Sequence, residues 1–432
     1  MKRWSQHRVR ALFRHHGPNS LIFRRRLAMV GGAISIGLVA LLFAGIADRA
    51  NHAFLALYAE HRYVPLLLTP LGFVLIVWAT RRYAPDARGS GIPQVIAGSG
   101  DPDGAACSLI SIRTVAIKAI LTFASLLCGG STGREGPTVQ IAAALMALWH
   151  RAARVEMRTS MIIAGGAAGV AAAFNTPLAG IAFAIEELAA AYEQRMALLV
   201  MTAILISGVI ALGLHGDYLY FGAIDASMKV QTAIFVAPVA GILGGLAGGW
   251  FSRLLLGATF AQTGPIATLR ARPLLFALLC GIVVAVVGVW TGLTWGPGYL
   301  PAHAMIVGVE APFWFGIAKF ATTTATAIAG LPGGIFAPSL AVGAGFGNML
   351  RWFFPGDPSG AVVLLGMVAY FTGVVRAPLT AVFILTEATG SRGLMFPMMA
   401  AALIADQASQ WVCREKLYHG LARAFSPKVA ED

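Results

Sequence analysis

The chain has 432 residues, of which 57% are hydrophobic and only 12% are charged, and its formal net charge is +13. Ordinary soluble domains hold about 25% charged residues. The low charged fraction of this chain, together with its mean hydropathy of +0.74, excludes that class. The excess positive charge could indicate nucleic-acid binding. However, eight basic residues lie within positions 1–26, where they would face anionic lipid headgroups. We therefore expect no nucleic-acid partner.

Windows of about 17 to 25 apolar residues recur along the chain and are long enough to cross a bilayer as helices. They include residues 27–47, 64–80, 161–185, 274–290 and 394–411. Many of the 50 Gly and 21 Pro residues lie inside the apolar stretches. This composition predicts an all-α polytopic membrane protein with many short, tilted or broken helices.

Positive charge at both ends of the chain predicts its orientation. Residues 1–26 contain no acid, and the tail after residue 412 is also rich in basic residues. The positive-inside rule then places both termini in the cytoplasm. No small-residue cleavage site follows the first apolar window, so we expect a retained helix rather than a signal peptide. The predicted organisation is a basic segment 1–26, a transmembrane domain 27–412 and a cytoplasmic tail 413–432.

An internal repeat joins two parts of the chain at a single offset of 201 positions. A first repeat of about 64–215 and a second of about 231–412 are predicted from it. The matched pairs are Lys118 and Lys319, Gly133 and Gly334, Pro137 and Pro338, Gly165 and Gly366, Pro177 and Pro378, and Glu186 and Glu387. Sequence alone does not decide whether these halves are parallel or inverted.

In both halves a Gly-x-x-x-Pro segment interrupts apolar sequence, at residues 133–137 and 334–338. Such a segment predicts a helix N-terminus inside the membrane, with free backbone N–H groups and the positive end of the helix dipole. Two of these ends meeting near the midplane would bind an anion without a full positive charge. The alternative is that both segments are only tight helix-packing turns.

Acidic residues within apolar segments are expensive and are candidates for function. Glu135 stands inside the first interrupted segment, and Glu186, Glu187 and Glu387 end apolar runs. Beside an anion site, an ionised Glu135 would compete with the anion for the same donors, and a protonated one would leave. Glu135 could instead be a helix N-terminal acid stabilised by the dipole. The other three could simply mark the water interface or pair with a nearby Lys or Arg.

We found no pattern that predicts a metal site, a cofactor or an enzyme. No His-Glu-x-x-His motif occurs, and the four Cys residues have no metal-ligand spacing. An intramembrane hydrolase or acyltransferase would need a Ser or Cys nucleophile with a His partner, and no motif supports one. A purely structural or lipid-binding role would leave the repeated interrupted helices unexplained.

These motifs together resemble the CLC family of chloride channels and proton-coupled chloride exchangers, over almost the whole chain after the leader. The resemblance is carried by three segments that look like the family's anion-site signatures, at residues 89–93, 133–137 and 334–338, and by residues 173–180 and 376–380. A Tyr in the last helix, Tyr418, completes the set. The family fold consists of two inverted repeats of tilted helices. The family assembles as a homodimer in which each subunit has its own pathway.

The resemblance implies a role for each matching residue. Ser90 and Tyr418 would offer hydroxyl donors to the anion, together with the backbone N–H groups of Ile335 and Phe336. Glu135 matches the external gating glutamate, and Glu187 matches the internal proton-transfer glutamate of the exchangers. The residues expected to form the backbone of the pore motifs are Gly89, Gly91, Gly133, Arg134, Gly136 and Gly334.

The resemblance therefore implies proton-coupled chloride antiport in a cell membrane, in the manner of the bacterial inner-membrane members. Ser at position 90 is associated with a preference for chloride. A passive chloride channel of the same family is the alternative, in which Glu187 would be incidental. Gln94 stands where the first motif usually carries Glu, which leaves the part played by that acid in doubt. About 20 residues follow the last apolar window, so we expect no paired cytoplasmic nucleotide-sensing domains.

Overall fold

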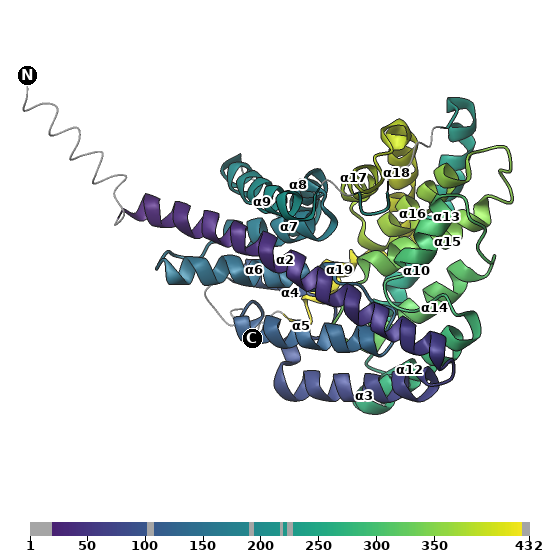
Figure 1. Cartoon of the computed structure of the whole chain (residues 1–432), viewed down its shortest axis with the longest axis horizontal. Coiled ribbons are helices and arrows are strands. Elements are labelled where there is room, and N and C mark those ends of the chain that lie inside the picture. The colour runs from purple at the N-terminus through teal and green to yellow at the C-terminus, as the bar shows by residue number, and fades with distance from the viewer. Residues whose placement is uncertain (1–19, 102–107, 190–193, 217–218, 223–227, 426–432) are drawn as a thin grey trace, which may run out of the picture.

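The computed structural model describes residues 20–101, 108–189, 194–216, 219–222 and 228–425, and within these residues it is helical with no strand. Figure 1 shows the arrangement. The helices are α2 (Leu21–Glu60), α3 (Pro65–Tyr83), α4 (Ile92–Gly100), α5 (Ile112–Leu127), α6 (Glu135–Ala152), α7 (Thr159–Phe174), α8 (Pro177–Phe183), α9 (Gln194–His215), α10 (Val230–Phe260), α11 (Gly264–Ala271), α12 (Pro273–Thr291), α13 (Tyr299–Ile306), α14 (Phe315–Ile328), α15 (Phe336–Leu350), α16 (Ser359–Val375), α17 (Pro378–Thr389), α18 (Met395–Val412) and α19 (Leu417–Ala422).

The apolar windows become helices with one exception. Four windows lie, to within one residue, inside α2, α3, α12 and α18. The window 161–185 is divided, because Asn175 ends α7 in the left-handed conformation (φ 57°) and Pro177 starts α8. A π-helical turn, Ala184–Leu188, then follows α8. Among the described residues, five helices are long and apolar enough to cross a membrane: α2, α3, α9, α10 and α12.

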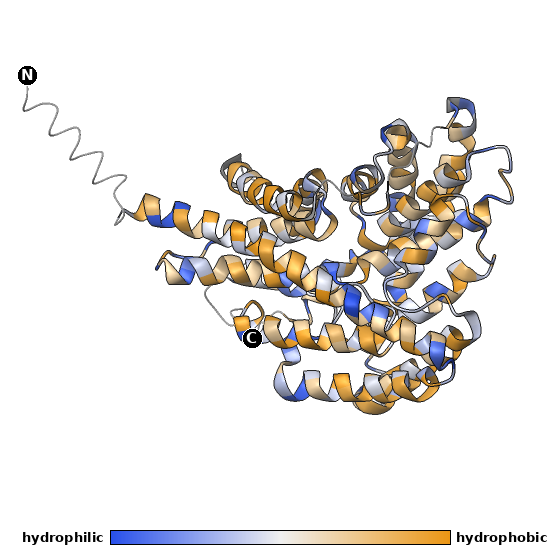
Figure 2. Cartoon of the chain, viewed as in Figure 1, coloured by the Kyte–Doolittle hydropathy of each residue, from blue (hydrophilic) through white to orange (hydrophobic). Residues whose placement is uncertain are grey.

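Apolar side chains cover the outside of the molecule as well as its core. Figure 2 shows apolar residues along most of the length of the long helices. Leu67 and Leu198 each expose 73% of their surface, and Leu42 exposes 67%. α7 and α16, which correspond to one another in the two repeats, are instead buried almost all round. A helix that is apolar all round belongs in the interior, so these two helices form the centre of their halves.

The two halves of the chain meet at their matching glycines. Gly133 N–H donates to Gly334 O, and Gly334 N–H donates to Gly133 O, both at 2.7 Å. The pair forms an antiparallel bridge. Equivalent residues that exchange both hydrogen bonds are related by a local two-fold axis, so the chain runs in opposite directions through the two halves. The predicted fold of two inverted repeats is confirmed.

A second reciprocal contact joins the halves through Glu186 and Glu387. Glu387 accepts hydrogen bonds from the backbone N–H groups of Leu178 (3.2 Å) and Ala179 (3.0 Å), at the start of α8. Glu186 accepts from the equivalent N–H groups of Leu379 (2.9 Å) and Thr380 (2.8 Å), at the start of α17. Each carboxylate therefore caps the helix of the opposite repeat, where it also faces the positive end of the dipole. This contact gives both residues a structural role.

We predict that removal of either cap destabilises the fold without altering the expected anion site. Glu387→Ala and Glu186→Ala each leave two helix N–H groups without their acceptor, which costs about 1 to 2 kcal/mol. Thermal unfolding in detergent, followed by Trp fluorescence, should give a lower Tm for both variants. The control is Glu60→Ala at the exposed end of α2. A Tm for both cap variants equal to that of the control would contradict this role.

Candidate anion site

Three loops converge where the repeats meet. Gly333 N–H donates to Gly89 O at 3.2 Å, beside the paired Gly133 and Gly334. The N-termini of α4, α6 and α15 therefore lie close together. Neither α6 nor α15 receives a capping hydrogen bond from the side chain of its N-cap residue, Arg134 or Ile335. The first backbone N–H groups of α6 and α15 therefore have no acceptor from these N-cap side chains. N–H groups at a helix N-terminus favour the binding of a negatively charged group.

This convergence requires residues without a side chain. Gly91 adopts a φ of +112°, which an L side chain rarely tolerates, and its Cβ would lie 2.7 Å from Gly136 O. A Cβ on Gly136 would lie 2.3 Å from the hydroxyl oxygen of Ser90. The expected motif glycines are therefore brought together, and their small size permits the contact.

Two buried hydroxyl groups face one another beside these loops. Ser90 precedes α4, Tyr418 lies on α19, and their side chains point toward each other. The two groups are near enough to interact, but within the described residues neither hydroxyl oxygen makes a hydrogen bond of good geometry. A buried hydroxyl without a partner costs free energy, so both groups are available as donors to an anion. The family resemblance implied this pair, although the two residues are 328 positions apart.

Phe336 provides the apolar wall of the site. Its ring packs against Phe371 (centroids 4.9 Å apart), Phe183 (5.8 Å) and Tyr418 (5.9 Å). Its backbone N–H is the first of α15, next to Ile335. Exclusion of water strengthens the interaction of an anion with these neutral donors.

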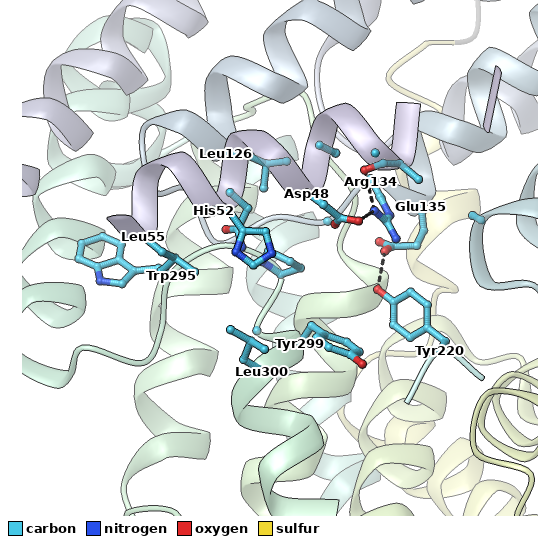
Figure 3. A pocket seen from close by; sticks show the side chains of 18 of the residues that line it. Asp48, His52, Leu55, Leu126, Arg134, Glu135, Tyr220, Trp295, Tyr299 and Leu300 are labelled. Atoms are coloured by element: carbon cyan, nitrogen blue, oxygen red, sulfur yellow. Dashed lines mark hydrogen bonds and ion pairs between the residues drawn. The ribbon is translucent and has the colours of Figure 1, made fainter. Parts of the chain in front are cut away.

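Glu135 is the first residue of α6 and is buried. Its Oε1 lies 3.4 Å from the hydroxyl of Tyr220, as Figure 3 shows. The backbone N–H groups of Glu135 itself and of Ala337 also face the carboxylate. The carboxylate therefore stands at the positive ends of two helices, one from each repeat. An anion would seek the same donors, so the ionised carboxylate and an anion compete for this position.

Arg134 has a different role from its neighbour. Its guanidinium forms an ion pair with Asp48 and donates to Ala44 O at 2.8 Å, both on α2. The side chain thus anchors the start of α6 to α2. Only its backbone belongs to the loop that faces the site.

Two cavities reach the loops from opposite sides. The Glu135 cavity, of about 490 Å³, is lined by the second half of α2, including Asp48 and His52, and by Tyr220. The Ser90 cavity, of about 400 Å³, is lined by Ser90, Ile335 and three arginines, Arg81, Arg88 and Arg270. A short turn after Glu60 joins α2 to α3, so the two helices run in opposite directions. The Glu135 cavity lies beside the end of α2 and the Ser90 cavity lies beside the end of α3, so the two cavities are on opposite sides.

Glu187 lies on the π-helical turn after α8, and its side chain is fully buried. Its Oε1 is 3.2 Å from His419 Nδ1, and its Oε2 is 3.7 Å from Lys416 Nζ. Both basic residues flank Tyr418 in the sequence. The fold therefore brings the second predicted acid beside the helix that carries Tyr418.

Gln94 fastens the segment that leads to Ser90. The side chain is buried, and its amide donates to Asp86 O (3.0 Å) and Arg88 O (2.6 Å). An ionised Glu at this position could not donate to these carbonyl groups. The amide therefore holds the loop by two bonds that an ionised acid at this position could not make.

Lys319 was not selected from the sequence as a functional residue. Its fully buried ammonium donates to Ser131 Oγ (2.8 Å), Thr294 O (2.9 Å) and Gly296 O (2.7 Å). It thus ties the segment before Gly133 to the wall of the Glu135 cavity. A lysine inside an apolar run is itself a signal of a buried role, and the repeat had pointed to this position.

The comparisons with known proteins agree with this arrangement. The sequence profile of the family described as "Voltage gated chloride channel" matches residues 71–410. The H(+)/Cl(-) exchange transporter ClcA of Cronobacter sakazakii is 31% identical over 389 residues, 84% of this chain and 80% of that protein. The protein of the same name from Salmonella typhi is 31% identical over 404 residues, 88% of this chain and 82% of that protein.

Solved structures show the same fold. A slow cyanobacterial Cl-/H+ antiporter superposes with a TM-score of 0.78 at 22% identity, over 93% of this chain and 98% of that one. A CLC-type fluoride/proton antiporter superposes with a TM-score of 0.74 at 23% identity, over 91% of this chain and 96% of that one.

We predict that Gly136→Ala weakens chloride binding. The added methyl group displaces the Ser90 hydroxyl, and one neutral hydrogen bond contributes about 1 to 1.5 kcal/mol, or roughly a five- to tenfold change in Kd. Isothermal titration of the purified protein with chloride measures the effect. Gly257→Ala in α10, where an added Cβ meets no atom within 4 Å, is the control. An unchanged Kd for Gly136→Ala would remove Ser90 from the anion site.

Proposed function

The chain belongs to the voltage gated chloride channel (CLC) family, and from this premise we propose that it exchanges chloride for protons across a cell membrane. The observation that carries the proposal is the position of the Glu135 carboxylate at the N-termini of α6 and α15. A carboxylate that occupies an anion's donors leaves them only when it is protonated. Each release of the position to chloride then requires the binding of a proton.

The proposed chloride site uses neutral donors alone. Ser90 and Tyr418 supply hydroxyl groups, and Ile335 and Phe336 supply backbone N–H groups. A full positive charge would hold chloride too tightly, whereas neutral dipoles bind it well enough to replace water and weakly enough to release it. The two cavities would give chloride access to this site from either side of the membrane.

A second buried acid favours exchange over a passive channel. Glu187 is fully buried, and it is paired with Lys416 and His419 rather than with backbone donors. A channel would need Glu135 only as a gate and would have no use for Glu187. In an exchanger, Glu187 provides a proton acceptor on the far side of the anion site, and we assign it that role.

We place the Ser90 cavity on the cytoplasmic side. The start of α2 and the end of α3 lie on this side, and they carry Arg24, Arg25, Arg26, Arg81 and Arg82. The positive-inside rule assigns such a face to the cytoplasm. The Glu135 cavity then opens to the exterior, and the chain's termini are both cytoplasmic.

We also propose that the protein is a homodimer within the lipid bilayer. α8 and α17 are only 7 and 12 residues long, and Leu178 and Leu379 at their starts are exposed. Facing lipid, these short helices would bring their capped ends and the carboxylates of Glu186 and Glu387 close to hydrocarbon, which is unfavourable. A second copy of the chain would cover this face with protein.

Liposomes that contain the purified protein test the proposal. Valinomycin and potassium hold the voltage near zero while a chloride gradient is imposed and external pH is recorded. Proton movement against its gradient, driven by chloride, is the expected result. Chloride movement without coupled proton movement would instead identify a passive channel.

We predict that Glu135→Gln separates chloride movement from proton movement. The neutral amide resembles the protonated acid permanently, so chloride flux should continue while uphill proton movement falls to the background of empty liposomes. Glu60→Gln, at the exposed end of α2, should retain the coupling of the wild type. Proton-driven chloride uptake that survives in Glu135→Gln would contradict the gating role of this residue.

A further inference from the structure

An exposed histidine touches a fully buried acid on the cytoplasmic side of the site. The Glu187 side chain has no exposed surface, whereas the side chain of His419 is 44% exposed. The two are joined by the contact between His419 Nδ1 and Glu187 Oε1, at 3.2 Å. One face of the imidazole therefore meets solvent and one of its nitrogens meets the acid.

We propose that His419 is the relay that carries protons between the cytoplasm and Glu187. The inference rests on the proposed exchange and names the group through which its protons pass. Imidazole is the side chain that changes charge near neutral pH, and it can take up a proton at one nitrogen and release the proton held at the other. Few groups are better suited to connect water with an acid that water does not reach.

The proton balance of the step is simple. A water-borne proton binds Nε2 of the neutral ring, and the proton on Nδ1 passes to Oε1 of the Glu187 carboxylate. The ring is neutral again, and Glu187 is a neutral carboxylic acid. One proton has entered the ring and one has left it. The exposed ring then returns to its first tautomer by exchanging protons with water.

The other groups around Glu187 do not offer this route. Lys416 lies 3.7 Å from Oε2 and donates to the backbone oxygen of Glu186 at 2.9 Å. Its single nitrogen cannot take up a proton at one atom and release another elsewhere, so its part is to hold the carboxylate in place. Tyr418 is fully buried and is not a solvent contact. α7 and α8, which pack against the turn of Glu187, contain no charged residue.

The relay also separates the proton path from the chloride path. The Ser90 cavity is lined by Leu421, Ala424 and Phe425 at the end of the chain's last helix and the residues after it, but not by His419 or Glu187. Chloride would thus approach the site at Ser90, whereas protons would enter through His419. Two separate approaches allow both ions to use the cytoplasmic side without sharing one opening.

His419→Asn tests the relay. The Asn side-chain nitrogen takes the place of Nδ1 and keeps a hydrogen-bond donor toward Glu187, but it binds no second proton. Chloride-driven proton movement in liposomes should slow by about a hundredfold or more, which is the lower end of the range that positioned proton donors contribute. Imidazole at tens of millimolar on the cytoplasmic side should restore most of the rate. His61→Asn, at the exposed C-cap of α2, should behave as the wild type.

A structural role for His419 is distinguished in the Glu135→Gln background, in which chloride is expected to move without protons. The added His419→Asn should leave that chloride flux within about twofold. A loss of chloride flux in the double variant, or a slowed single variant that imidazole does not restore, would overturn the relay. So would coupled proton movement in His419→Asn at the wild-type rate. A wild-type protein that moves chloride without protons would overturn the proposed exchange itself.

Discussion

The reciprocal hydrogen bonds between Gly133 and Gly334 are the contact on which the rest of the structure depends. They bring the starts of α6 and α15 together, and with them the N-terminal dipoles of both repeats. The bond pair tolerates almost no side chain nearby, since a Cβ on Gly334 would lie 2.8 Å from Gly136 N. Inversion of the repeats follows from the same contact, because only opposed chains can exchange both bonds between equivalent residues.

The same contact explains how the proposed site would hold an anion in an apolar interior. A permanent cation at the centre would be costly to bury and slow to release its ligand. The structure instead collects backbone N–H groups and two buried hydroxyls, on Ser90 and Tyr418, inside walls of Phe side chains. Two buried cations stand outside this ring of donors: Arg134 is paired with Asp48, and Lys319 is bound to backbone oxygens and Ser131.

Four glutamates that look alike in the sequence have three different environments. Glu186 and Glu387 cap helices of the opposite repeat and stabilise the fold. Glu135 faces the donors of the proposed anion site, and Glu187 contacts an exposed imidazole and a lysine. In the proposed mechanism, the surroundings of each carboxylate, rather than its position in an apolar run, decide whether it holds the structure or exchanges protons. The proposed path of protons therefore uses Glu135 and Glu187, the two acids that have no glutamate at the matching position of the second repeat.

The sequence by itself determined the helical membrane fold, the existence of two repeats and the loops that would meet. Those features depend on apolar length, on Gly and Pro positions and on one constant offset, all of which are local or periodic. Tertiary structure established the inversion, which the family resemblance had implied, and it alone decided the roles of Glu186 and Glu387 and the contacts of Lys319, Gln94 and His419. The reason is that these contacts join segments 6 to 232 residues apart through single side chains. A spacing pattern in the sequence does not show which residue such a side chain contacts, whereas the packed structure does.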